Sequence, residues 1–509
     1  MRSTMWRLGA SRQTPGLDAT PAEIRHAAVI DIGSNSIRLV VYRLEGRAIW
    51  TVYNEKAQAG LGRDLQTTGR LSPEGVETAM AVLRRFRVLL QGWSSRETFV
   101  VATAAVREAR DSRAFLRAVE DETGISVRVL SGEEEARYGA LGVIAGQADA
   151  SGVAGDLGGS SLELVRLDDV GQGVSLPLGP FALGAPRPLD QDRVRRSISR
   201  ALKPHTERMS TREFHAVGGA WRNLALLHME LEDYPLHIAH QYEIKRMDLL
   251  DLCRFVARQS RTSLEGIQGL SRKRFDTLPY AAVVLSEIVQ ALEVQRVVIS
   301  AYGLREGLLL DSMPTAIREQ DPLVSGCEAL VAQGGLISDL GPALEDFIRP
   351  VFDSLPPAFG LRDAVLTAAA CRLADLGARL HPDHRADLAF EKALRAPVAG
   401  MTHPERAYLA CAVFARHDSA PNPPEPEVVN RLLSPERRAR ARALGSAIRL
   451  ACDLAGRNVE VLRHAALDLE GDRLRLAAEP GWEDMLLGEQ TAKRALTLAQ
   501  ALKIRLQLG

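Results

Sequence analysis

The spacing of hydrophobic residues divides this chain into regions of different character. Up to about residue 316, short apolar runs typical of buried or half-buried strands alternate with stretches of helical period. Helical period dominates from about residue 318 to residue 456, and a hairpin pattern beside helices follows to the C-terminus. Because alternating strands and helices indicate an α/β fold, we predict an α/β region, an all-α region and a small C-terminal α/β unit.

The α/β region contains two successive sets of strands and helices. The first set is predicted as three strands over residues 27–53, a helix over 74–93, a strand over 98–105, a helix over 107–123, a strand over 125–131 and a helix over 133–144. The second set is predicted as a hairpin at 155–165, a strand over 173–179, a helix over 192–207, a strand–helix unit over 214–225 and another over 296–310. Reactive residues gather at strand ends, where open α/β folds bind ligands.

One sequence pattern occurs twice, which indicates that the two sets are related half-domains. Residues 30–40 read IDIGSNSIRLV and residues 155–165 read GDLGGSSLELV, so both fit the template D-[IL]-G-[SG]-[NS]-S-[IL]-x-L-V. In each copy an apolar run leads to an aspartate, a short Gly/Ser turn and a second alternating run, as in a hairpin. Gly/Ser hairpins are mostly plain turns, but a plain turn has no reason to recur with its aspartate, glycine and strand pattern intact.

The residues of the two turns suit phosphate. Their glycines and serines add little bulk, so backbone N–H groups can approach an anion, and the hydroxyls add donors. These positions are Gly33, Ser34, Ser36, Gly158, Gly159, Ser160 and Ser161. Asp31 and Asp156 would repel a bare phosphate, but a carboxylate fits there if a hard cation such as Mg²⁺ lies between it and the phosphate oxygens. Alternatively, Asp31 only caps its turn.

Composition narrows the class of protein. The 509 residues are 46% apolar and 25% charged, with 64 basic and 64 acidic side chains, so no global charge attracts nucleic acid or another polyanion. The five cysteines are scattered and form no C-x-x-C pair, which disfavours disulfides and thiolate zinc sites and favours a reducing cytoplasmic location. No run has signal-peptide character or reaches the ~20 apolar residues that span a membrane.

Four further motifs join the two turns. They are ATAAVREARD (102–111), SGEEEAR (131–137), AVGGAWRNLA (216–225) and AYGLREG (301–307). In this order and spacing the set resembles the exopolyphosphatase/guanosine pentaphosphate phosphohydrolase (Ppx/GppA) family. That family is a branch of the actin, sugar kinase and heat-shock chaperone ATPase superfamily, which has a duplicated ribonuclease H-like core. The resemblance is close over residues 27 to about 312 and loose beyond.

The resemblance implies a domain organisation. We expect a mobile N-terminal extension (1–26), two ribonuclease H-like domains (27–145 and 146–316), an all-α HD-like domain (317–445) and a small C-terminal α/β domain (446–509). It also suggests a homodimer.

The family's functional residues carry over wherever its motifs match. The first phosphate loop falls on Asp31, Gly33, Ser34, Asn35 and Ser36, and the second on Asp156, Gly158, Gly159, Ser160 and Ser161. The general base falls on Glu135, a second catalytic glutamate on Glu163, and the phosphate-gripping arginine on Arg107.

The chemistry agrees with these roles. Hydrolysis of a phosphoanhydride needs an in-line water, a carboxylate to deprotonate it and cations or N–H groups on the transition-state charge. Glu135 opens a helix near the turns, and Glu163 occupies in the second hairpin the place of Arg38 in the first. This difference suggests that Arg38 binds the anion while Glu163 binds water or Mg²⁺, together with Asp31 and Asp156.

Simpler interpretations stay open for several of these residues. Glu133 and Glu134 are more typical of a solvated helix start, where they complement the helix dipole. Arg107 could pair with Glu108 or Asp111 on the surface.

The substrate prediction rests on a departure from the family. A threonine commonly follows the paired glycines there, whereas Ala220 and Trp221 follow Gly218 and Gly219 here. This turn contacts a nucleoside in the superfamily, so the loss of the hydroxyl favours inorganic polyphosphate. The alternatives are a guanosine pentaphosphate (pppGpp) 5′-phosphohydrolase and a non-hydrolytic regulator that binds polyphosphate or pppGpp/ppGpp. A sugar kinase is disfavoured because Glu135 and Glu163 suit water activation.

The helical region supplies candidate metal ligands and basic runs. The candidates are Asp375, His381, His384, His403, His417 and Asp418, but Ala374–Asp375 stands where an HD site has His-Asp, so we expect a metal-free structural or polymer-guiding domain. The Arg-rich runs 192–200 and 435–443 either line a polyanion channel or form solvated helix faces.

Overall fold

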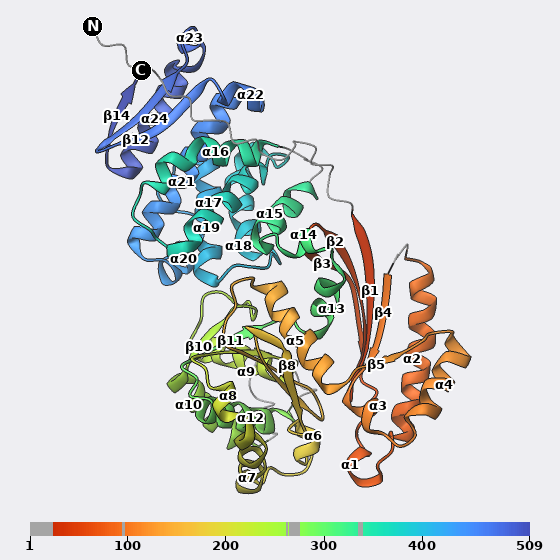
Figure 1. Ribbon diagram of the computed structural model, residues 1–509. Coiled ribbons are helices and arrows are strands. Elements are labelled where there is room, and N and C mark those ends of the chain that lie inside the picture. Colours follow the sequence, from red (N-terminus) through yellow and green to blue (C-terminus); the bar gives the residue numbers. More distant parts are fainter. Residues whose placement is uncertain (1–23, 94–96, 261–262, 264–274, 334–338) are drawn as a thin grey trace.

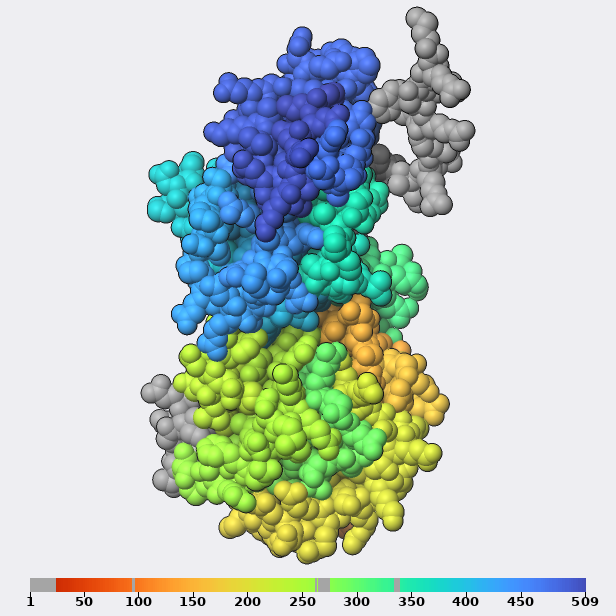
Figure 2. Space-filling view, turned by 90° about the vertical axis from the view of Figure 1, so that its left-hand side faces the viewer, coloured from red at the N-terminus to blue at the C-terminus, as the bar shows by residue number. Residues whose placement is uncertain are grey.

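The structure, a computed structural model, describes residues 24–93, 97–260, 263, 275–333 and 339–509. Figure 1 shows two α/β halves at one end of an elongated molecule, a helical unit in the middle and a small mixed unit at the far end. The space-filling view, from another side, shows the second α/β half, the helical unit and the C-terminal unit in this order (Figure 2). Most of the predicted N-terminal extension (1–26) lies outside the described residues, while its last two residues already belong to the first strand.

The first sheet has the order β3-β2-β1-β4-β5. Its strands are β1 (Arg25–Ile32), β2 (Ile37–Glu45), β3 (Ala48–Ala57), β4 (Glu97–Ala102) and β5 (Arg128–Val129). One face is covered by α2 (Pro73–Gln91), α3 (Ala104–Glu108) and α4 (Ser112–Thr123), which share an apolar core with it. The three strands predicted for residues 27–53 are therefore confirmed.

Three predicted boundaries in this half were wrong. The strand predicted for 98–105 ends at Ala102, because Thr103 precedes a short helix. The helix predicted for 107–123 is two helices, since the backbone is extended at Ala109 and the Asp111 carboxylate accepts a hydrogen bond from the Leu71 amide at 3.1 Å. The strand predicted for 125–131 pairs over only two residues.

The second sheet repeats the core of the first. Its order is β10-β11-β9-β6-β7-β8, with β6 (Val153–Leu157), β7 (Leu162–Arg166), β8 (Asp169–Leu176), β9 (Glu213–Val217), β10 (Glu243–Lys245) and β11 (Arg296–Ser300). β1 pairs antiparallel with β2 and parallel with β4, and β6 pairs in the same way with β7 and β9. This duplication confirms the predicted ribonuclease H-like core.

Helices bury the outer face of the second sheet. These are α7 (Gln191–Leu202), α9 (Gly219–Leu231), α10 (Arg246–Ala257) and α12 (Leu278–Ala291), which enclose one apolar core with the sheet. The helix predicted for 192–207 was too long, because α7 ends at Leu202 and a 3₁₀ turn, Lys203–His205, separates it from α8 (Thr206–Met209).

A pair of helices fills the space between the two sheets. α5 (Gly132–Gly146) packs Tyr138 and Ala145 toward the first sheet, and Ala136, Ala140 and Val143 toward the second. α13 (Leu304–Ser312) follows the last strand of the second half, yet its leucines pack on the first sheet.

The contact between these two helices depends on glycine. A Cβ atom at Gly307 of α13 would overlap the carbonyl oxygen of Tyr138 in α5, and one at Gly142 would overlap the carbonyl oxygen of Gly303. Only glycine therefore lets the two backbones approach this closely.

The helical and C-terminal units share one apolar core. The helices are α14 (Thr315–Arg318), α15 (Pro322–Ala332), α16 (Leu340–Asp353), α17 (Asp363–Arg372), α18 (Arg385–Arg395), α19 (His403–His417), α20 (Pro426–Leu432), α21 (Pro435–Ala455) and α22 (Val459–Leu462). The end of the chain forms β12 (Ala465–Glu470), β13 (Arg473–Ala478), α23 (Glu483–Leu486), α24 (Glu489–Leu502) and β14 (Arg505–Leu508).

Two details of this region differ from expectation. The boundary expected at residue 445 falls inside α21, which continues unbroken to Ala455. The proline-rich loop expected over 421–429 ends sooner because Pro426 starts α20, a position where proline lacks only an N–H that has no intrahelical partner. Within the described residues, no helix combines the length and apolar composition required to cross a membrane.

We predict that Gly307→Ala lowers stability, because the added Cβ forces α5 and α13 apart. Overpacking of this kind costs about 1–3 kcal/mol or more, measured as a lower midpoint of urea unfolding. Gly488→Ala is the control, since a Cβ there meets nothing within 4 Å. Equal midpoints for the two variants would show that the helix contact tolerates the extra atom.

Candidate active site

The two repeated turns face each other across one cleft of about 190 Å³. In each turn the amide of the first glycine donates to a serine carbonyl, Gly33 to Ser36 and Gly158 to Ser161, both at 3.0 Å. A Cβ placed on Gly159 of the second turn would lie 3.2 Å from the Cβ of Ser34 in the first. The repeat is therefore preserved in hydrogen bonding, and its two copies are in contact.

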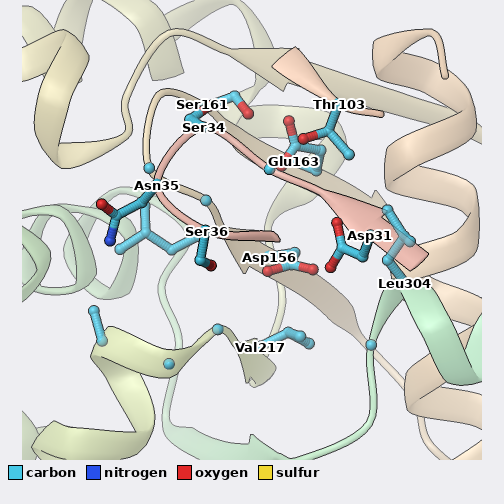
Figure 3. A pocket seen from close by; sticks show the side chains of 18 of the residues that line it. Asp31, Ser34, Asn35, Ser36, Thr103, Asp156, Ser161, Glu163, Val217 and Leu304 are labelled. Carbon is cyan, nitrogen blue, oxygen red and sulfur yellow. The ribbon is translucent and has the colours of Figure 1, made fainter. Parts of the chain in front are cut away.

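Strand register explains why the predicted charged residues reach this cleft. Asp31 lies opposite Arg38 in the first hairpin, and Asp156 lies opposite Glu163 in the second. Alternate residues of a strand share a face, and each of these four lies on the face that packs against α5 and α13. Figure 3 shows the carboxylates of Asp31 and Asp156 pointing toward one another.

Most of the predicted site residues line the cleft. They are Asp31, Gly33, Ser34, Asn35, Ser36, Arg38, Glu135, Asp156, Gly158, Gly159, Ser161 and Glu163. Two others do not: Ser160 is buried with its hydroxyl toward Gly62, and Arg107 lies behind Glu135.

Of the three consecutive glutamates, Glu135 alone is buried at the cleft. Glu133 is exposed, and Glu134 closes a capping box in which its carboxylate accepts from the Ser131 amide at 2.8 Å. Glu135 retains 8% exposure and accepts a hydrogen bond from Arg107 at 2.9 Å. The interpretation of Glu133 and Glu134 as helix-start residues therefore agrees with the structure.

Burial sets the proton affinity of Glu135. Desolvation raises its pKa to about 7; Arg107 opposes this shift, whereas the charges of Asp156 and Asp31 add to it. A carboxylate with a pKa near neutral can take a proton from water and return it to solvent at physiological pH. A group with this pKa in a cleft is also typical of a functional site.

Arg107 is an internal partner of Glu135 in this structure. Its guanidinium donates to the Glu135 carboxylate and to the Leu130 carbonyl, both at 2.9 Å, while Glu108 lies farther away at 3.9 Å. The pairing of Arg107 is therefore internal and not a purely surface one, and its contact with phosphate stays a prediction.

Burial also raises the proton affinity of the other acids. It raises the pKa of Asp156 to about 6, helped by the charge of Asp31. It holds the pKa of Glu163 well above the usual range, and the charges of Glu135 and Asp156 add to the effect. Burial raises the pKa of Asp31 as well. With Glu135, four carboxylates thus lie in low-dielectric surroundings, where a bound cation would stabilise their ionised forms.

Several residues that line the cleft are not among those predicted from the sequence. Arg305, Arg222, Lys56 and Thr103 also line the cleft. Arg305 stands in the second residue of α13 and interacts electrostatically with Glu306, Asp31 and Asp156. Arg305 belongs to the motif AYGLREG, but the motif alone does not place its side chain. The arginine reaches the cleft because α13 packs on the first sheet.

Basic groups gather beside the carboxylates. The pKa of Arg38 falls to about 10, because the side chain is buried and because Arg305 and Arg222 are nearby. Like charges held this close are costly unless an anion binds between them. The cleft therefore has a carboxylate side suited to a cation and water, and a guanidinium side suited to an anion.

The donor set partly supports the predicted Mg²⁺ ligands. Within the described ranges, no three His, Cys, Asp or Glu residues are already arranged to hold a metal ion, so the set of Asp31, Asp156 and Glu163 stays a prediction. Glu163 accepts a hydrogen bond from Ser175 at 2.7 Å. The facing pair Asp31 and Asp156 still fits Mg²⁺, which commonly takes one or two carboxylates and completes its shell with substrate phosphates and water.

The candidate ligands of the helical unit bond to protein groups instead. His403 contacts the Tyr234 hydroxyl at 3.0 Å and the His240 carbonyl at 3.1 Å. His417 contacts the Leu376 carbonyl at 2.9 Å, and Asp375 pairs with Arg457 at 2.7 Å. The other three, His381, His384 and Asp418, are exposed.

Several arginines of the two basic runs hold the fold together. Arg437 lies over the Phe359 ring, 4.0 Å from its centroid, and donates to the Ala358 carbonyl. Arg440 donates to the Pro356 carbonyl at 2.9 Å, and Arg193 to the Leu183 carbonyl at 2.8 Å. These contacts favour a structural role over a polyanion channel.

The duplicated core and the cleft between its halves define an actin-like fold. Comparison with known proteins specifies the family. Residues 40–316 match the Ppx/GppA phosphatase family, and residues 357–508 match the exopolyphosphatase C-terminal family. The first match alone spans more than half of the chain, and the protein belongs to the Ppx/GppA phosphatase family.

Solved structures agree with this fold. An exopolyphosphatase-like protein is 25% identical with a TM-score of 0.51, over 57% of this chain and 98% of its own. An exopolyphosphatase from Cytophaga hutchinsonii is 23% identical with a TM-score of 0.52, over 56% of this chain and 96% of its own.

We predict that phosphate release depends on the ionisation of Glu135. The pKa of Glu135 is about 7. We therefore expect kcat/KM for phosphate release to be low below pH 7, where Glu135 is protonated, and to increase as the pH passes through 7. Initial rates between about pH 5.5 and 8.5 measure the limb, since kcat/KM reports ionisations of the free enzyme. A flat profile over this range would contradict the assignment.

Proposed function

We propose that this protein is an exopolyphosphatase that removes the terminal phosphate of inorganic polyphosphate. One observation carries the proposal: Glu135, with a pKa of about 7, is buried against a cleft formed by two facing Gly/Ser turns. The turns supply N–H and hydroxyl donors for phosphate oxygens, and Glu135 supplies a base for water. A phosphoanhydride hydrolase needs both within reach of one phosphorus atom.

In the proposed reaction Glu135 acts on water and the turns hold the phosphate. Glu135 accepts a proton as the water oxygen attacks the terminal phosphorus, and the bond to the bridging oxygen breaks. Inorganic phosphate and a chain shorter by one phosphate leave. Arg305 and Arg38, on the basic side of the cleft, stabilise charge on the phosphoryl oxygens.

Each remaining cleft carboxylate has a place in this scheme. Asp31 and Asp156 would hold Mg²⁺, which when bound neutralises phosphate charge. Glu163 is kept in place by Ser175 and orients the water beside Glu135. Arg107 holds the Glu135 carboxylate through its hydrogen bond, and the phosphate contact inferred from the family stays a prediction.

The preference for polyphosphate over pppGpp rests on the start of α9. Gly218 has a φ of +116°, and its bare Cα lies against the Leu157 carbonyl. Ala220 lines the cleft without a hydroxyl, and Trp221 is fully buried, with its indole N–H bonded to the Ala281 carbonyl at 3.0 Å. This turn therefore offers a nucleoside no side-chain hydrogen bond at either position.

We predict that Glu135→Gln reduces turnover about 10²- to 10⁴-fold, the usual range for loss of a general base. The amide keeps the shape of the side chain, so binding of tripolyphosphate, measured by calorimetry, should change little. Glu133→Gln is a matched control on the same helical turn, because Glu133 is exposed. Equal phosphate release by the two variants would exclude Glu135 as the base.

We predict faster hydrolysis of long-chain polyphosphate than of pppGpp under matched Mg²⁺ concentrations. Initial rates of phosphate release give kcat/KM for both substrates. A higher value for pppGpp would instead assign the protein as a pppGpp 5′-phosphohydrolase. Binding of either compound without catalytic release of phosphate would identify a regulator.

A further inference from the structure

Glu306 is a buried carboxylate that the proposed reaction does not use. It retains 8% exposure, and both of its oxygens are hydrogen-bonded. One accepts from the amide of Gly303, the N-cap residue of α13, at 2.9 Å. The other accepts from the hydroxyl of Tyr42 at 2.6 Å.

Tyr42 connects this helix start to the first sheet. It lies in β2 on the same face as Arg38, is 1% exposed, and is 264 residues away from Glu306 in sequence. Such a short hydrogen bond from a phenol to a carboxylate in a dry interior is strong and directional. The bond therefore fixes the first turn of α13 against the strand that begins at the first phosphate loop.

Arg305 is the residue that this arrangement can control. It precedes Glu306 directly, lines the cleft, and has Glu306 as its strongest electrostatic neighbour, followed by Tyr42, Asp31 and Asp156. If Glu306 lost its phenol donor, its carboxylate would turn toward another donor, because a buried acceptor without a partner is costly. This rotation would release the start of α13 and the Arg305 guanidinium attached to it.

We propose that Tyr42 is a positioning residue, which acts through Glu306 to hold the Arg305 guanidinium over the phosphoryl group in the cleft. This inference rests on the proposed function, because it assumes that Arg305 contacts a phosphoryl substrate. Tyr42 itself touches neither substrate nor water in this scheme. A purely structural Tyr42 would affect stability alone, independently of Arg305.

The test is a double-mutant cycle with Tyr42→Phe and Arg305→Lys. Tyr42→Phe should lower kcat/KM for polyphosphate about ten-fold, as expected for loss of a hydrogen bond to a buried charge. Lysine keeps the positive charge of Arg305 but lacks the planar guanidinium, whose donors contact phosphoryl oxygens only in one orientation. In the Arg305→Lys background, Tyr42→Phe should therefore change kcat/KM by less than about two-fold, since contacting residues give non-additive effects.

A matched control separates positioning from stability. Tyr242 is also buried, and its hydroxyl makes a bond of 2.7 Å to His228 within the outer core of the second half. Tyr242→Phe should lower the unfolding midpoint about as much as Tyr42→Phe but leave kcat/KM within about two-fold of wild type. An equal loss of kcat/KM in both backgrounds, or a loss of stability alone in Tyr42→Phe, would overturn the proposal.

A binding measurement distinguishes this inference from the proposed function. Affinity for tripolyphosphate is measured by calorimetry for all four members of the cycle. If the wild-type protein binds polyphosphate but does not hydrolyse it, the proposed exopolyphosphatase activity is wrong. The double-mutant cycle is then calculated from the affinities for tripolyphosphate instead of from kcat/KM. Additive effects on affinity would then refute the positioning role, whereas non-additive effects would support it.

Discussion

The whole site depends on the contact of α5 with α13 between the two sheets. Gly142 and Gly307 let the helix backbones touch, and apolar residues of the pair bury against both sheets. Both helices begin at the cleft, so this packing places Glu135 and Arg305 there together. The side chains that face the phosphate loops therefore depend on a contact made farther along the same helices.

The cleft holds buried acids and arginines close together, and the charges within each group repel one another. Burial opposes ionisation of four neighbouring acids, and three arginines nearby repel one another. Arginines offset part of this cost, because Arg107 donates a hydrogen bond to Glu135 and Arg305 interacts electrostatically with Asp31 and Asp156. In the proposed function, a phosphate chain places negative charge beside the arginines and its cation places positive charge beside the acids, so binding relieves both repulsions.

The helical and C-terminal units contribute to the fold in a different way. Their shared core is apolar, and the histidines and arginines that suggested a metal site or a channel are largely used in hydrogen bonds that hold the unit together. His403 bonds to Tyr234 and to the His240 carbonyl, which ties this unit to the second half-domain. These contacts explain how the helical unit packs against the second half-domain. The candidate active site lies apart from it, between the two sheets.

The sequence by itself determined the local features, because they depend on residues close together in the chain. The two hairpins, their aspartates, and the burial of Glu135 beside an exposed Glu133 follow from spacing, turn chemistry and resemblance to the family. Some predicted boundaries were wrong where a hydrogen bond to a distant residue overrides the local pattern. An example is the helix predicted over 107–123, where Asp111 accepts from the Leu71 amide. Tertiary structure alone decided that Arg107 pairs with Glu135, that Ser175 donates to Glu163, and that Arg305 enters the cleft. These outcomes depend on helices that return across long stretches of chain, and no local pattern records which sheet such a helix will cover.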